Sequence, residues 1–225
     1  MPWNPQDYDP DWPFELLGTS FTLEAPSTAL LVVDLQVGQL RPGPQLVAER
    51  PDIAGYWQQE IDRRVMPNAG RLVEYFRGRD LGVVYTRNGC LTPTGQEMTW
   101  RLRPEQPPAQ VYRGTPEYEI DERVAPLASE LVLDKPTSGA FTCSWLDHAL
   151  RNMGVDAVVL AGVVSDMCVL GTARTAAELG YRTVICEDAC ASFTQRAHLE
   201  AMLMHARKFG RVLQSAEIAA ELDRS

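Results

Sequence analysis

The apolar run Ala157-Val158-Val159-Leu160-Ala161 is the clearest indication of the fold class of this chain. Five consecutive apolar residues are typical of a strand that is buried on both faces of a parallel sheet. A helical segment is expected after it at about residues 166–179, and Gly180 stands where a left-handed residue commonly ends a helix. A buried strand that leads directly into a helix indicates an α/β domain.

The same alternation continues in both directions from this stretch. Further apolar runs predict strands at residues 29–33, 82–86, 131–133, 183–186 and 211–213, and helices are expected at about residues 66–79, 144–152 and 195–209. Strands that alternate with helices through right-handed crossovers form a parallel sheet between two helical layers. We therefore predict one three-layer α/β/α domain over residues 28–225. Residues 37–65 and 88–130 are longer than ordinary connections between strands and helices. Long loops usually carry functional residues or cover a site.

Length and composition narrow the class of protein. A chain of 225 residues buries roughly 70% of its unfolded surface, so it needs no disulfide or metal for stability. Its 21 Lys and Arg against 30 Asp and Glu give a net charge of −9, which argues against a nucleic-acid partner. No apolar run is long enough to span a bilayer, and residues 1–10 lack the features of a secretory signal. We expect a cytoplasmic protein with no membrane partner.

The first 27 residues are expected to form an N-terminal arm. They combine prolines with aromatic residues, namely Trp3, Tyr8, Trp12, Phe14 and Phe21. Aromatic side chains favour burial, so the arm is expected to pack either across its own domain or onto a partner subunit. An arm of this kind is compatible with a homodimer or a homotetramer.

The chain has five cysteines, Cys90, Cys143, Cys168, Cys186 and Cys190. An odd number of cysteines with no pairing pattern argues against a secreted disulfide scaffold. It leaves open a catalytic role for one of the thiols. Cys168 is the strongest candidate for a catalytic thiol, because it follows the strand predicted at residues 157–161. The other four are interpreted as packing residues.

Three chemically useful side chains follow three of the predicted strands. Ligands of parallel α/β sheets bind beyond the carboxyl ends of the strands, and Asp34, Lys135 and Cys168 stand there. If Ser165 or Asp166 caps the helix, Cys168 lies in its first turn, where the helix dipole and Lys135 lower the pKa of the thiol. Asp34 is then placed to accept the thiol proton. The backbone N–H groups at the start of the same helix are placed to stabilise an oxyanion.

Each of these residues also has a plain structural interpretation. A cysteine at a buried helix start is commonly a small hydrophobic residue, Asp34 is in a usual turn position, and Lys135 is compatible with a solvated charge. Their occurrence together at strand ends favours the functional interpretation. A buried Asp and Lys without a role would also be costly to desolvate.

The sequence resembles the isochorismatase-like cysteine hydrolases, the group that includes nicotinamidases, N-carbamoylsarcosine amidase, and ureidoacrylate and biuret hydrolases. The resemblance covers roughly residues 29–213 and rests on three motifs in order, ALLVVDLQ at 29–36, DKPTSGAF at 134–141 and GVVSDMCV at 162–169, with EDACAS at 187–192. It implies a six-stranded parallel sheet and a triad of Asp34, Lys135 and Cys168. It also implies hydrolysis of a non-peptide C–N bond in a small amide or carbamoyl compound, through a thioester.

The resemblance further implies a cis peptide bond between Val163 and Val164. That bond would direct the Val164 N–H, together with the Cys168 N–H, into an oxyanion hole. Two alternatives remain open at this point. One is a vinyl ether hydrolase of the isochorismatase type, which needs Asp34 but not the thiol, and the other is a catalytically silent binding protein on the same fold.

Departures from the family pattern bear on cofactors and substrate. Metal-dependent nicotinamidases carry an Asp-x-His cluster after the second strand, whereas His148, His198 and His205 all fall on predicted helices. We therefore expect no metal and no cofactor, and interpret the three histidines as helix-surface or core residues. Candidates for the substrate pocket are Gln36, Arg87, Trp100, Tyr112 and Phe141. Arg101 and Arg103 are candidates for holding a carboxylate, although a solvated position is the more common one for each.

Overall fold

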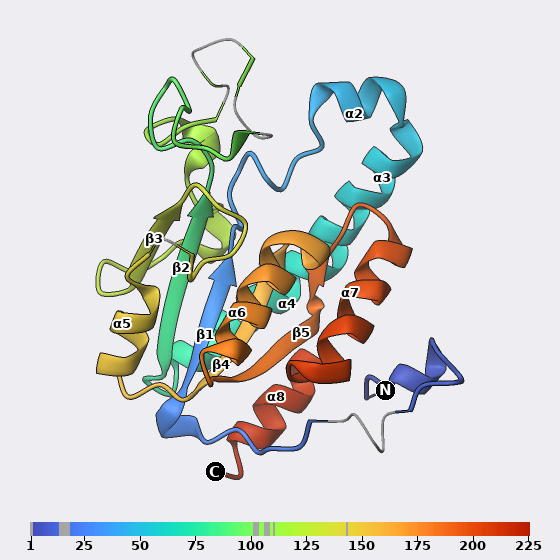
Figure 1. Ribbon diagram of the computed structural model, residues 1–225, viewed down its shortest axis with the longest axis vertical. Helices are drawn as coiled ribbons and strands as arrows, with labels where there is room; N and C mark the ends of the chain where they lie inside the picture. Colours follow the sequence, from blue (N-terminus) through green and yellow to red (C-terminus); the bar gives the residue numbers. More distant parts are fainter. Residues whose placement is uncertain (1, 14–18, 101–103, 106–108, 110, 143) are drawn as a thin grey trace.

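The computed structural model describes residues 2–13, 19–100, 104–105, 109, 111–142 and 144–225. Its centre is a six-stranded sheet in the order β3-β2-β1-β4-β5-β6, in which every pairing is parallel (Figure 1). The strands are β1 (Thr28–Val33), β2 (Gly82–Asn88), β3 (Leu131–Lys135), β4 (Ala157–Val163), β5 (Arg182–Ala191) and β6 (Arg211–Leu213). Each contains a predicted strand, so the predicted parallel sheet is confirmed. β1 and β4 are buried along their whole length, as expected for central strands.

Helices cover both faces of the sheet and complete the predicted three-layer sandwich. One apolar core packs under α3 (Pro51–Glu60), α4 (Met66–Arg77) and α8 (Ser215–Leu222). The other packs under α5 (Leu146–Asn152), α6 (Leu170–Glu178) and α7 (Gln195–Lys208). No helix among the described residues is long and apolar enough to cross a membrane.

The expectation of a long loop at residues 37–65 is wrong for most of that segment. It contains α2 (Pro44–Glu49), α3 and a π-helical turn η3 (Ile61–Val65), which continues directly into α4. Trp57, Ile61 and Val65 are four residues apart and fully buried, so one face of this helical stretch packs on the sheet. The loop expected at residues 88–130 contains only η5 (Pro116–Tyr118) and η6 (Glu122–Val124) among its described helical turns.

The described parts of the arm lie against α7 and α8 of the same chain (Figure 1). Trp12 is 3% exposed, and the Arg207 guanidinium lies 5.0 Å from its ring centre. The backbone N–H of Leu23 donates to Glu221 Oε1 at 2.7 Å. Phe14 lies outside the described residues. Of the two packing modes predicted for the arm, these contacts correspond to the one across its own domain.

Candidate active site

The carboxyl ends of three strands place Asp34, Lys135 and Cys168 at one edge of the sheet. Asp34 follows β1 with a φ of 54°, a left-handed conformation that aspartate tolerates better than most residues. Lys135 is the last residue of β3 and reaches past β2, which lies between β1 and β3. Cys168 lies in the π-helical turn η7 (Ser165–Val169), which connects β4 to α6 and is called the Cys168 turn below.

Asp34 and Lys135 form a buried ion pair. Lys135 Nζ donates to Asp34 Oδ2 at 2.7 Å, and the side chains of Lys135 and Asp34 are only 0% and 2% exposed, respectively. Thr86 Oγ1 donates to the other carboxylate oxygen at 2.6 Å. Lys135 Nζ also donates to the carbonyls of Thr137 at 3.1 Å and Ser138 at 3.0 Å. These hydrogen bonds compensate for the cost of removing both charges from water.

The Cys168 thiol is protonated at neutral pH. Burial raises its pKa, the nearby Asp34 carboxylate raises it further, and Lys135 lowers it by less, so that the pKa is about 12. The prediction of a lowered pKa at a helix start is therefore wrong for the unliganded protein. Desolvation and a neighbouring carboxylate outweigh the favourable effects of Lys135. The arrangement places a neutral thiol beside a carboxylate that can accept its proton.

The local structure before Cys168 also differs from the prediction of a side-chain cap. The N-cap residue is Val164, and no side chain caps the turn. Ser165 Oγ instead lies 2.8 Å from His198 Nδ1, while Asp166 Oδ1 accepts a hydrogen bond from Ser192 Oγ at 2.6 Å. The Val164 carbonyl accepts from the N–H groups of Met167 at 3.0 Å and Val169 at 3.2 Å, which fixes the turn.

A glycine allows β4 to approach β1 closely beside the site. Gly162 has a φ of 138°, and a Cβ at this position would lie 2.0 Å from the Val33 carbonyl oxygen. Only glycine fits this position, because any side chain would overlap the β1 backbone. The peptide bond between Val163 and Val164 that follows is cis, which confirms the expectation from the family resemblance.

The side chains of two predicted pocket residues, Gln36 and Arg87, form hydrogen bonds or ion pairs within the chain. Gln36 is fully buried, donates to the Tyr118 carbonyl at 2.7 Å and accepts from the Asn88 N–H at 2.7 Å. Arg87 donates to Asp134 at 2.7 Å and also pairs with Glu119. Contacts of these residues with substrate stay a prediction, but both side chains already position the loops around the site.

The remaining pocket candidates lie in different surroundings. Trp100 is 80% exposed, and Tyr112 forms a β-bridge with Cys90. The Phe141 ring lies 5.7 Å from the ring of Tyr181, which directly precedes β5 at the opposite edge of the sheet. A substrate contact by these three residues stays a prediction. Arg101, Arg103 and Cys143 lie outside the described residues.

The three histidines occupy helices as predicted, but one has a role that the sequence did not indicate. His148 on α5 is exposed, and His205 on α7 is buried, with a pKa lowered to about 4 by desolvation. His198 on α7 contacts the Cys168 turn through Ser165, and nothing in the residue spacing predicts this contact. In the described part of the chain, no group of three or more His, Cys, Asp and Glu residues gathers as a metal site.

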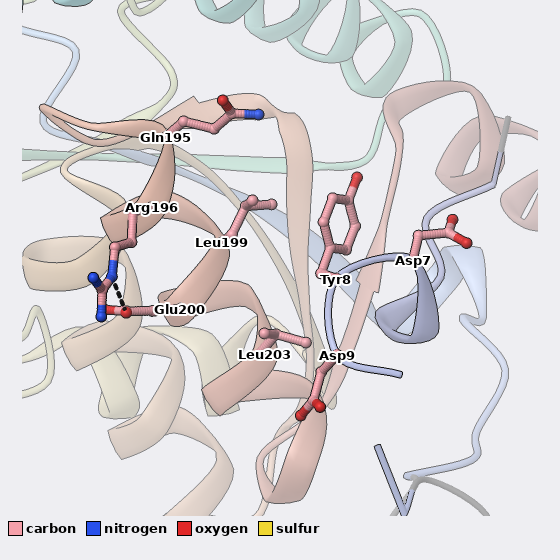
Figure 2. Close-up of a pocket in the computed structure, with 8 residues that line it drawn as sticks. All are labelled: Asp7, Tyr8, Asp9, Gln195, Arg196, Leu199, Glu200 and Leu203. Atoms are coloured by element: carbon pink, nitrogen blue, oxygen red, sulfur yellow. Dashed lines mark hydrogen bonds and ion pairs between the residues drawn. The ribbon is translucent and has the colours of Figure 1, made fainter. Parts of the chain in front are cut away.

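A separate surface pocket of about 630 Å³ lies between the arm and α7 (Figure 2). Tyr8, Leu199 and Leu203 provide its apolar side chains, while Asp7, Asp9 and the Arg196–Glu200 pair make its rim polar. None of the residues that line it is a predicted site residue, so it is distinct from the Asp34, Lys135 and Cys168 cluster.

Comparisons with known proteins all point to one family. Residues 28–217 match the family model described as Isochorismatase domain. The chain is 29% identical over 176 residues to the ureidoacrylate amidohydrolase RutB of Serratia proteamaculans, a match that covers 72% of this chain and 68% of that protein.

Two solved structures extend the similarity over most of the fold. N-carbamoylsarcosine amidase from Thermoplasma acidophilum is 27% identical with a TM-score of 0.65, and the match covers 84% of this chain and 96% of that one. An isochorismatase family protein from Burkholderia thailandensis is 28% identical with a TM-score of 0.71, over 91% of this chain and 100% of that one.

Proposed function

Because the chain belongs to the isochorismatase family, we propose that it is a cysteine hydrolase that cleaves the C–N bond of a small amide or carbamoyl compound. The amidohydrolase and amidase names of two relatives support this reaction class. The observation that carries the proposal is the position of the Cys168 thiol beside the buried Asp34–Lys135 pair. This combination supplies a nucleophile, a base and a countercharge that holds the base in place.

The first half of the reaction forms a thioester. Asp34 accepts the Sγ proton as Sγ attacks the substrate carbonyl carbon, and the carbonyl electron pair moves to oxygen. The N–H groups of Val164 and Cys168 stabilise the oxyanion, an effect of about 3–4 kcal/mol per donor in other enzymes. Asp34 then gives the proton to the departing nitrogen, the C–N bond breaks, and ammonia or an amine leaves.

The second half of the reaction regenerates the free thiol of Cys168. Water attacks the thioester carbonyl, with Asp34 accepting its proton, and the C–S bond breaks. The proton passes to Sγ as the acid product leaves. Lys135 keeps a positive charge beside Asp34 throughout, so the carboxylate is never buried without a partner.

A pool of small amides that includes ureidoacrylate and N-carbamoylsarcosine tests this proposal. We expect ammonia or amine release, and mass spectrometry of the intact protein should show an acyl adduct that maps to Cys168. Cys168→Ala should abolish both signals at an unchanged circular dichroism spectrum. Cys186→Ala, which removes another buried thiol, is the matched control and should retain turnover.

The same variants separate the alternatives. A vinyl ether hydrolase would keep its activity in Cys168→Ala and after alkylation of Cys168, because that reaction needs the carboxylate alone. C–N turnover that survives the loss of Cys168 contradicts the proposed mechanism. An absence of turnover and of any adduct across the pool contradicts the proposed function.

A further inference from the structure

A chain of hydrogen bonds, buried where it begins at Ser165, leads from the first residue of the Cys168 turn to the opposite helical layer. Ser165 Oγ lies 2.8 Å from His198 Nδ1, and His198 Nε2 lies 3.0 Å from Glu187 Oε1. Glu187 Oε1 in turn accepts from Arg64 Nη1 at 3.2 Å. Ser165 is fully buried and His198 is almost fully buried, so the bond between them is shielded from water, whereas the side chains of Glu187 and Arg64 are partly exposed.

Glu187 reaches this position because β5 bulges. Leu160 of β4 pairs with Ile185, but the next pair in register is Gly162 with Cys190, so β5 carries extra residues between them. Arg64 holds the bulge, since its guanidinium donates to the Glu187 carbonyl at 2.9 Å and to the Cys190 carbonyl at 2.8 Å. The bulge is therefore a fixed support for the Glu187 carboxylate.

The charge on Glu187 requires a proton on Nε2 of His198. Burial raises the pKa of Glu187, but the His198 hydrogen bond and the Arg64 charge outweigh burial and lower it. A carboxylate only accepts hydrogen bonds, so Nε2 of His198 must donate to it. In a neutral ring Nδ1 accepts the Ser165 hydroxyl hydrogen, and in a charged ring Nδ1 donates to the Ser165 oxygen. In either form the 2.8 Å bond holds the Ser165 side chain against His198.

We propose that His198 and Glu187 are positioning residues that act through Ser165 to hold the Cys168 turn against Asp34 and Lys135. Ser165 is the first residue of that five-residue turn, and its neighbour Val164 supplies the carbonyl on which the turn closes. Fixing Ser165 therefore fixes the distance of Sγ from the buried ion pair. The consequence for catalysis rests on the proposed function, but the position of the thiol does not.

The reactivity of the Cys168 thiol reports its position without any substrate. In the intact protein burial and Asp34 hold the thiol protonated, so iodoacetamide should alkylate Cys168 slowly at pH 8.5. Ser165→Ala and His198→Ala release the turn and move Sγ away from Asp34. A fall of about one unit in the pKa of the thiol makes alkylation about tenfold faster. Peptide mass spectrometry assigns the rate to Cys168 among the cysteines.

A double-mutant cycle tests whether His198 acts through Ser165. If it does, the Ser165→Ala/His198→Ala variant alkylates no faster than the faster single variant, because either change already breaks the chain. His198→Asn keeps a carbonyl oxygen near the place of Nδ1 and should restore a rate within about twofold of the unmodified protein. The matched control is Thr28→Val, which removes the hydrogen bond from the buried Thr28 side chain to the Glu24 carbonyl at the other edge of the sheet and should leave the rate unchanged.

The proposal is overturned if Ser165→Ala and His198→Ala alkylate at the rate of the unmodified protein. It is equally overturned if their effects multiply in the double variant, or if Thr28→Val accelerates alkylation as much as they do. Where C–N turnover is found, we expect the two variants to lower kcat with KM little changed. A protein that shows the alkylation pattern but cleaves no amide contradicts the proposed function and leaves the positioning roles intact.

Discussion

At the scale of single residues, the stability of the site depends on the pairing of Asp34 with Lys135. Lys135→Met would leave the Asp34 carboxylate buried without its countercharge, beside the neutral side chains of Thr86 and Cys168. Breaking a buried ion pair on one side costs about 3–5 kcal/mol, and we expect urea denaturation to show a loss of that size. The double variant Asp34→Asn/Lys135→Met contains no unpaired charge and should recover most of the free energy of unfolding that Lys135→Met loses. A single variant as stable as the unmodified protein would contradict a buried pair.

His205 makes the stability of the protein depend on pH. Its pKa is lowered to about 4 in the folded chain by desolvation, so the unfolded chain, with an ordinary value of about 6.5, binds the proton first. The free energy of unfolding should therefore fall as the pH decreases from about 6.5 to about 4, with a loss of about 2 kcal/mol by pH 5.

Urea denaturation of the unmodified protein and of His205→Leu, each at pH 7 and pH 5, isolates this contribution. The variant should lose about 2 kcal/mol less than the unmodified protein between the two pH values. Equal losses in the two proteins would show that His205 is not the group that titrates.

The residues of the candidate site could be found from the sequence, but their chemical state could not. Asp34, Lys135 and Cys168 each follow an apolar run, and parallel strands bring such positions to one edge. The pKa of the thiol depends on burial by segments far apart in the chain, so its direction was predicted wrongly. His198 was missed for the same reason, because its contact with Ser165 spans 33 residues of sequence.

At the scale of elements, the close approach of β1 and β4 depends on Gly162. Gly162→Ala would place a Cβ 2.0 Å from the Val33 carbonyl oxygen, so the strands must separate beside the site. We expect a loss of more than about 3 kcal/mol in the free energy of unfolding, or failure to fold. Gly180→Ala is the control, since Gly180 has a φ of 94° and open space around it, and should cost about 1–2 kcal/mol. Equal losses for the two variants would contradict the steric argument.

Strands were predicted better than helices for a physical reason. A continuous apolar run such as residues 157–161 is nearly sufficient for a strand buried on both faces. The helical stretch at residues 44–65 has only one buried face, and Pro44 and Pro51 at helix starts resemble loop residues in the sequence. The bulge in β5 was not predictable either, because it is held by Arg64 from another layer.

At the scale of the whole molecule, the arm adds stability through contacts with α7 and α8. Deletion of residues 1–20 would remove the buried Trp12. We expect the free energy of unfolding to fall by about 2 kcal/mol, the usual value for exposing a large apolar side chain. Urea denaturation measures this loss, and light scattering measures the mass of the assembly. Unchanged stability with a smaller assembly would instead favour packing onto a partner subunit.

The burial of the cysteines has a consequence for the redox behaviour of the molecule. The described cysteines Cys90, Cys168, Cys186 and Cys190 are all buried and free, and burial raises the pKa of each thiol. Peroxides and disulfides react with thiolates, so at neutral pH we expect these side chains to resist oxidation to sulfenic acid and mixed disulfides. If Cys168 is the proposed nucleophile, the desolvation that delays its ionisation until a carbonyl is in place should also protect it from oxidants in the absence of substrate.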